Sequence, residues 1–379
     1  MRLDRFTARR LCLGLMLFAP LFGCGDSSAP PGGNSPKPEL GESAATPNGN
    51  LKRIIVLTNG NAPFWDAAAA GAKDAEKELN CAADGFQVVV DRNDFKAEGQ
   101  IEKLRQYASA TDVVAVAISV TDALNEAIPE ELRKLQKAGI KVVTIDSDVN
   151  RETARDSRFA YLGTDNIVGG RELGVAAKGL LPNGGKYATF VGLKNAANAQ
   201  ERISGLAQGA GDKFIQAENL GDGGDEAVAR TNVKDALSRH EDMALLAGIW
   251  SYNTPAIIDI VKQANSREKL KLIGFDADPP AILGMGEGML DAMVVQNPYQ
   301  MGYQGVRLLR AMVKNDEATV KEMLPNREAK DGDILDTGLK VIVPNTDSPL
   351  KRELFGPKTE FLKLDEFKLW LEKYKLTGS

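Results

Sequence analysis

Residues 53–58 read Arg-Ile-Ile-Val-Leu-Thr, and this apolar run opens the pattern that decides the fold. An Ala-rich stretch with helical spacing follows at 64–79. Apolar runs and helical stretches then alternate as far as 141–146, with runs at 86–91 and 113–118 and helical stretches at 96–109 and 122–138. Strands that alternate with helices in this way predict βαβ units and a parallel sheet. Because the runs are nearly all apolar, we expect helices on both faces of that sheet.

The pattern restarts after residue 158. Further apolar runs of strand length are separated by helical stretches, one of which is 167–180; the runs are 159–162, 186–191, 214–218, 244–249, 270–274 and 291–295. This number of βα units is larger than one sheet holds comfortably. We therefore predict an α/β protein with two doubly wound parallel-sheet lobes. An amphipathic helix is also expected at 365–374.

The N-terminus has the composition of an export signal. Arg2, Arg5, Arg9 and Arg10 precede an apolar stretch at 11–22, which is too short to span a bilayer as a helix. It ends Leu21-Phe22-Gly23-Cys24, which resembles the bacterial lipobox and implies cleavage before Cys24 and attachment of lipid there. The alternative is an ordinary signal peptide or an uncleaved anchor.

The segment after the signal is predicted to be a tether. Residues 24–50 are rich in Pro, Gly, Ser and Asn, a composition that buries little apolar surface. The sequence thus predicts a lipoprotein signal peptide at 1–23 and a flexible linker at 24–50. The expected location is the periplasm or the cell surface, with the protein held on a membrane by its lipid.

Composition disfavours several classes of function. The formal net charge is -5, which argues against nucleic acid as the main partner. The chain has one histidine, His240, so His-based catalytic triads and His-rich metal sites are not expected, and an enzyme is the less favoured reading. No cofactor is predicted. Two acidic loops remain: 221–225 is expected to be a flexible loop, and Asp331 to Asp333 either a tight turn or a cation loop.

Aromatic, acidic and amide side chains follow the predicted strands. In doubly wound sheets ligands bind beyond the carboxyl ends of the strands. Aromatic rings can cover the C–H faces of a sugar, while Asp, Asn and Gln exchange hydrogen bonds with its hydroxyls. The candidate residues at these ends are Phe64, Trp65, Asp146, Trp250, Asn253, Asp276 and Gln296.

Four segments resemble the type 1 periplasmic binding proteins of the ribose- and galactose-binding group. They are Asn-Ala-Pro-Phe-Trp at 61–65, the crossover at 161–170, Ile-Gly-Phe-Asp at 273–276, and the Gln-Asn-Pro crossover within 294–302. The resemblance implies two lobes joined by a three-segment hinge. The expected lobes are 51–163 plus 297–336, and 164–296 plus 337–379.

The resemblance also implies roles in the pocket. Phe64 and Trp65 would sandwich a sugar ring, with Trp250 as a further aromatic. Asp146, Asp276 and Gln296 would bind hydroxyls, and Asn253 matches a pocket Asn of the family. Gln200 and Arg202 complete the expected ligand set, with Arg202 alternatively forming only a salt bridge on its helix. Ala62, Ser147 and Gln200 depart from the ribose-type pattern, and the loss of two guanidiniums argues against ribose itself.

The implied activity is delivery of a monosaccharide to the permease of an ABC transporter, by a monomer that closes over its ligand. A sensing role beside a membrane kinase or a chemoreceptor is the alternative. A repressor of this fold would need an N-terminal DNA-binding helix-turn-helix, in the place where this chain has its apolar signal.

Overall fold

The computed structural model describes residues 51–346 and 348–379. The predicted signal peptide, the linker and the lipidation site at Cys24 lie outside the described residues. Within the described part of the chain, no helix is both long and apolar enough to cross a membrane.

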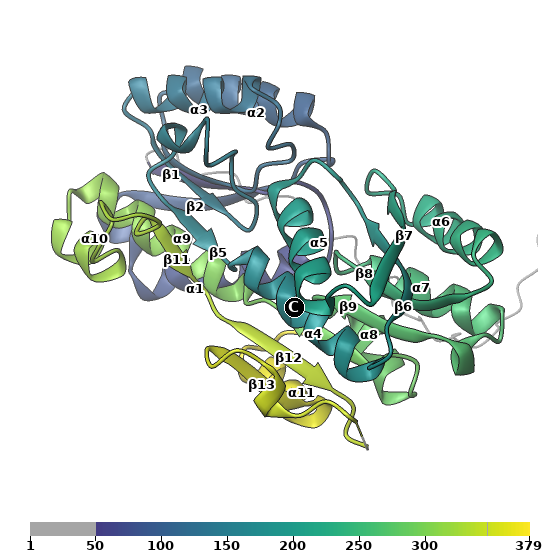
Figure 1. The fold of residues 1–379 in the computed structure, drawn as a ribbon. Coiled ribbons are helices and arrows are strands. Elements are labelled where there is room, and N and C mark those ends of the chain that lie inside the picture. The colour runs from purple at the N-terminus through teal and green to yellow at the C-terminus, as the bar shows by residue number, and fades with distance from the viewer. Residues whose placement is uncertain (1–50, 347) are drawn as a thin grey trace, which may run out of the picture. The chain divides into compact units, whose positions relative to one another are not determined.

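A six-stranded, wholly parallel sheet forms lobe 1, with the order β11-β5-β4-β3-β1-β2. Its strands are β1 (Lys52–Leu57), β2 (Phe86–Asp91), β3 (Val113–Ile118), β4 (Lys141–Ile145), β5 (Tyr161–Gly163) and β11 (Ile334–Asp336). Its helices are α1 (Phe64–Glu78), α2 (Ala97–Ser109), α3 (Ala127–Lys137), α9 (Pro298–Lys314) and α10 (Glu317–Met323). Helices α2 and α3 cover one face of the sheet, and α1 and α9 cover the other (Figure 1).

The residues of β1 show why the four positions from Ile54 to Leu57 are all apolar. Ile54 and Val56 are buried in the core beneath α1 and α9, whereas Ile55 and Leu57 are buried beneath α2 and α3. Successive side chains of a strand point to opposite faces of the sheet, so a strand covered on both sides needs apolar residues throughout. The predicted fold class is confirmed.

A seven-stranded sheet with the order β13-β12-β10-β9-β8-β6-β7 forms lobe 2. Its strands are β6 (Gly185–Val191), β7 (Phe214–Gly221), β8 (Met243–Gly248), β9 (Lys271–Phe275), β10 (Ala292–Val295), β12 (Leu339–Val343) and β13 (Thr359–Lys363). Its helices are α4 (Asn166–Leu180), α5 (Ala197–Ala210), α6 (Glu226–Arg239), α7 (Asn253–Gln263), α8 (Pro279–Gly286) and α11 (Leu364–Lys373).

The chain passes between the two sheets at three places. Residues 164–165 link β5 to α4, residues 296–297 link β10 to α9, and residues 337–338 link β11 to β12. Because β10 runs toward this junction and β12 runs away from it, the two strands pair antiparallel. The sheet of lobe 2 is therefore parallel apart from this one pair.

One predicted helix begins later than expected. The helix predicted at 122–138 starts at Ala127. The Asp122 carboxylate accepts a hydrogen bond from the Leu124 amide at 2.9 Å, and the Asn125 side chain accepts one from the Ala127 amide at 3.0 Å. Short polar side chains that bond the backbone two residues ahead stabilise turns in place of a helix.

Candidate ligand-binding site

A small cavity lies where strands of both lobes end. It follows the carboxyl ends of β1 and β4 in lobe 1 and of β8 and β9 in lobe 2, the edge at which doubly wound sheets bind ligands. Its volume is about 30 Å³, well below the roughly 300–1,000 Å³ of small-molecule pockets, so the lining side chains lie close together across it. The lining residues are Asn59, Ala62, Phe64, Trp65, Phe95, Asp146, Asn198, Arg202, Trp250, Ser251, Tyr252 and Asp276.

Aromatic rings from both lobes form part of the wall. Phe64 and Trp65, at the start of α1, meet edge to face with ring centroids 5.1 Å apart. The Trp65 indole donates a hydrogen bond to the Asn59 side chain, and the Trp250 indole donates one to the Asn198 side chain, each at 3.2 Å. These bonds fix the orientation of both indoles, so the cavity presents preset apolar surfaces to a ligand.

Arg202 lies between two carboxylates deep in the cavity. Its guanidinium nitrogens are 3.7 Å from an Asp146 oxygen and 3.5 Å from an Asp276 oxygen. Nε donates to the Asn166 side chain at 2.9 Å and Nη1 donates to the Ile249 carbonyl at 3.1 Å. The side chain is 1% exposed, so Arg202 bridges both lobes inside the cavity and is not merely a partner on its own helix.

Burial shifts the ionisation of both acids. It raises the pKa of Asp276 to about 7, although Arg202 and Gln296 oppose the shift. Burial also raises the pKa of Asp146, against Arg202 and hydrogen bonds from Ser119 at 2.8 Å and Asn198 at 3.2 Å. Loss of water disfavours the charged form, so further donors supplied by a ligand would favour the carboxylates.

Two polar atoms near this cluster have no hydrogen-bond partner among the residues that the structure describes. Arg202 Nη2 and Gln296 Oε1 are buried and make no hydrogen bond among the described residues. Buried polar groups are nearly always satisfied, and an unmade bond is costly. Arg202 Nη2 is a donor on a residue that lines the cavity, where a hydroxyl oxygen of a ligand could accept from it, whereas Gln296 is not a lining residue.

The other predicted residues lie behind or away from the cavity. Gln296 is fully buried and donates to Asp276 at 2.9 Å, so it contacts a lining residue. Asn253, also fully buried, accepts from the Trp250 amide at 3.1 Å and donates to Asp222 at 2.7 Å. Gln200 is exposed on α5 and is not among the lining residues.

Six lining residues are outside the predicted ligand set: Asn59, Ala62, Phe95, Asn198, Ser251 and Tyr252. Asn198 could have been found, because it lies one helical turn before Arg202 on the same face of α5. The loop at 221–225 was predicted to be flexible, but it is anchored here. Asp222 is 6% exposed and accepts hydrogen bonds from the Tyr252 hydroxyl at 2.5 Å and from the Gly224 amide at 2.9 Å.

The carboxylates of the acidic turn at Asp331 to Asp333 form ion pairs with arginines. Arg155 contacts Asp331 at 3.0 Å, and both Arg155 and Arg158 contact Asp333. Burial would raise the pKa of Asp333, but hydrogen bonds from Arg155 and Arg158 lower it well below its usual value. Among residues 51–346 and 348–379, no group of three His, Cys, Asp or Glu side chains is placed to hold a metal ion.

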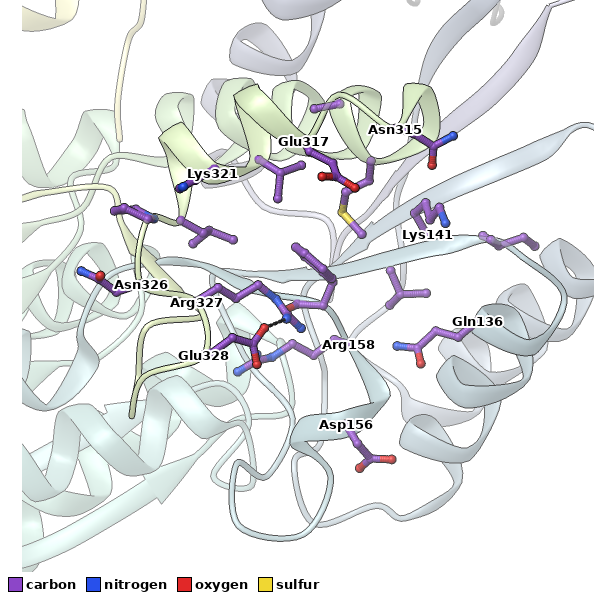
Figure 2. Close-up of a pocket in the computed structure, with 18 of the residues that line it drawn as sticks. Gln136, Lys141, Asp156, Arg158, Asn315, Glu317, Lys321, Asn326, Arg327 and Glu328 are labelled. Atoms are coloured by element: carbon purple, nitrogen blue, oxygen red, sulfur yellow. Dashed lines mark hydrogen bonds and ion pairs between the residues drawn. The ribbon is translucent and has the colours of Figure 1, made fainter.

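Figure 2 shows a wider hollow in lobe 1, between the α9–α10 region and the segments around Arg158 and Arg327. It includes Lys141, the first residue of β4, whereas Asp146 follows the last residue of that strand. The hollow is therefore at the opposite edge of the sheet from the small cavity. Its lining includes none of the buried atoms without a hydrogen-bond partner, so the small cavity is the candidate ligand site.

Two α/β lobes that enclose a small polar and aromatic cavity define a two-lobed ligand-binding protein. The family model for the periplasmic binding protein domain matches residues 53–317, and the chain belongs to this family. It is 22% identical over 275 residues to the ribose import binding protein RbsB of Escherichia coli, covering 70% of this chain and 86% of that protein. It is 24% identical to the D-allose-binding periplasmic protein of the same species, covering 67% and 82%.

Solved structures share the fold. An ABC transporter solute-binding protein from Burkholderia graminis, in complex with D-arabinose, superposes with a TM-score of 0.68 at 24% identity and covers 79% of this chain and 97% of that one. One from Agrobacterium vitis with bound D-fucose has the same TM-score and identity, with coverages of 77% and 95%.

Proposed function

We propose that this protein binds a monosaccharide outside the cytoplasm and delivers it to an ABC transporter, held on a membrane by lipid at Cys24. The observation that carries the proposal is Arg202 lying between Asp146 and Asp276 in a cavity walled by Phe64, Trp65 and Trp250. The names of the relatives support it, because they bind ribose, allose, D-arabinose and D-fucose.

The cavity offers a sugar both kinds of contact that it needs. The rings of Trp65 and Trp250 can cover C–H faces, while their indole N–H groups are already bonded to Asn59 and Asn198. The carboxylates accept from hydroxyls, and Arg202 Nη2 donates to a hydroxyl oxygen. A stereoisomer that leaves one of these buried groups without a hydrogen bond would bind less tightly by about 1–3 kcal/mol. The site can therefore discriminate among stereoisomers of a hexose or pentose.

Contacts between the lobes connect ligand binding with closure of the lobes. Asp146 of lobe 1 accepts from Asn198 of lobe 2 at 3.2 Å, and the Ala123 amide donates to the Asn195 carbonyl at 3.1 Å. Arg151 and Glu201 form an ion pair at 3.5 Å. A ligand that touches both lobes stabilises the arrangement in which these contacts form. The transporter would recognise that closed surface.

A thermal-shift screen tests the proposal. The purified protein is heated with pentoses, hexoses, sugar alcohols, nucleosides and amino acids in turn. A ligand that binds only the folded state adds about 4 kcal/mol of stability at a thousandfold excess over its Kd. We expect one monosaccharide to raise the Tm strongly. A shift with a different class of solute, and none with any sugar, would refute the assignment of the ligand.

The lipid anchor has a separate test. Cys24→Ser removes the only sulfur at the predicted attachment point, so we expect the protein to leave the membrane fraction and become soluble outside the cytoplasm. Membrane association that equals wild type would contradict the anchor while leaving the proposed ligand untouched.

A further inference from the structure

Phe95 belongs to lobe 1 but packs against lobe 2. It lies in the loop between β2 and α2, and its ring stacks on Trp250 of lobe 2 with centroids 6.0 Å apart and planes at 29°. The ring packs against the main hydrophobic core of lobe 2 and also lines the ligand cavity. It is therefore in contact with the second lobe and part of the wall that a ligand would meet.

The backbone holds Phe95 in a conformation that a bulky residue rarely adopts, with φ at +64°. Its amide donates to the Asn59 carbonyl at 3.0 Å. The buried Asn93 side chain donates to the same carbonyl at 3.2 Å and to the Lys96 carbonyl at 2.8 Å. A strained residue fixed by such a network is typical of functional sites.

Two glycines, one from each lobe, make room for the ring. A Cβ added to Gly60 of lobe 1 would lie 2.1 Å from Phe95 Cε1, and a Cβ added to Gly224 of lobe 2 would lie 2.5 Å from Phe95 Cδ2. Gly224 also has φ at +87°, so its backbone favours glycine by itself. Gly60 has no such φ, so the space for Phe95 is the reason for glycine there.

We propose that Phe95 is a closure latch, a residue of lobe 1 that holds the lobes closed by packing against lobe 2, and that it also determines specificity. As the lobes close, its ring enters a seat on lobe 2, which is the surface formed by Gly224 and Trp250. The proposal rests on the proposed function, because closure around a sugar is what brings the seat to the ring. Opening the lobes breaks the contacts with Trp250 and Gly224. The latch therefore slows release of the sugar more than it speeds capture.

A double-mutant cycle tests the latch. Phe95→Ala, Gly60→Ala and the double variant are compared with wild type for binding of D-ribose, D-allose, D-arabinose and D-fucose, by calorimetry and stopped-flow tryptophan fluorescence. We expect Phe95→Ala to weaken binding roughly 10- to 100-fold, mainly through faster dissociation. Gly60→Ala should weaken binding similarly in wild type, because it displaces the ring, but hardly at all in the Phe95→Ala background.

Leu369→Ala is the matched control, since Leu369 is 65% exposed on α11, which belongs to the C-terminal part of lobe 2. Wild-type dissociation rates in Phe95→Ala, or additive effects of the two substitutions, would overturn the latch. The expected change in dissociation rate at unchanged Tm is one that a merely structural role would not produce.

A crosslink reports the latch without any sugar. Phe95→Cys combined with Gly224→Cys should form a disulfide on treatment with diamide, seen by mass spectrometry of the peptides, while neither single variant should form one. If no sugar binds wild type but the crosslink forms, the proposed ligand fails and the latch stands. If a sugar binds but no crosslink forms, the latch fails and the proposed function stands.

Discussion

The Arg202 guanidinium lies 3.9 Å from the centroid of the Phe275 ring. This cation–π contact holds the guanidinium over the ring of the last residue of β9, while its nitrogens lie near the two carboxylates. Asp276 follows Phe275 directly, so one strand end supplies both the support for the cation and one of its acidic partners. The site is preorganised because the two are connected through the backbone.

Removing either acid should abolish tight sugar binding without unfolding the protein. Asp146→Ala and Asp276→Ala each delete an acceptor for a ligand hydroxyl and leave Arg202 short of a partner. We expect binding to weaken by at least about 100-fold, since bonds to charged groups are the strong ones. Calorimetry with the sugar found by the screen measures the loss. Asp235→Ala, with a side chain 55% exposed on α6, is the control; wild-type affinity in either cavity variant would rule out this pocket.

Stability of the unliganded protein should fall as the pH rises through the titration of Asp276. Its pKa is raised from 3.8 to about 7 in the folded state, so between these values the folded protein keeps a proton that the unfolded chain releases. Binding more protons in the folded state means that stability decreases with pH, and the decrease should end above about pH 7.

Asp276→Asn cannot titrate, so its Tm should exceed that of wild type by a margin that grows from pH 4.5 to 7.5. Burial raises the pKa of Asp278 to about 6, so this residue also titrates over the range. Because it does so in both proteins, its contribution cancels in the difference between their Tm values. A constant margin across that range would contradict the shift. Affinity for the sugar should rise over the same range, because its hydroxyls donate to the ionised carboxylate.

Arg202 should be essential to both binding and folding. Arg202→Met keeps much of the side-chain volume but removes the bonds to Asn166 and Ile249 and leaves two buried acids without a cation. We expect urea unfolding to show a loss of about 3 kcal/mol at neutral pH. The loss should shrink at pH 5, where protonation neutralises the acids. Arg171→Met, an exposed position on α4, is the control; equal losses at both pH values would refute the electrostatic explanation.

The sequence predicts those parts of the molecule in which local pattern decides position. Both faces of β1 are covered, so its apolar run predicts a buried strand. Asp146 and Asp276 follow strands whose carboxyl ends meet at the cavity. The antiparallel pairing of β10 with β12 was missed. It depends on where the chain returns from the other lobe, which no local pattern records.

Phe95 was missed for a related reason. A lone Phe in a polar loop predicts nothing, and its place in the cavity depends on a left-handed backbone and on Gly224, which lies far away in the sequence.

Asn253 and Gln296 have amides that matched the expected chemistry. The structure pairs them with Asp222 and Asp276, behind the surface that a ligand would touch.

The phase of α5 gives the sharpest contrast between neighbouring residues. Asn198 and Arg202 are four residues apart, so they share the inner face of the helix, whereas Gln200 lies between them in the sequence and points to solvent. Asn198→Ala should weaken sugar binding roughly tenfold, because it removes hydrogen bonds to both Asp146 and the Trp250 indole. Gln200→Ala should bind like wild type. Calorimetry of the two variants side by side tests this prediction. If Gln200→Ala lost as much affinity as Asn198→Ala, the exposed face of α5 would reach the ligand and the inner face would not define the site.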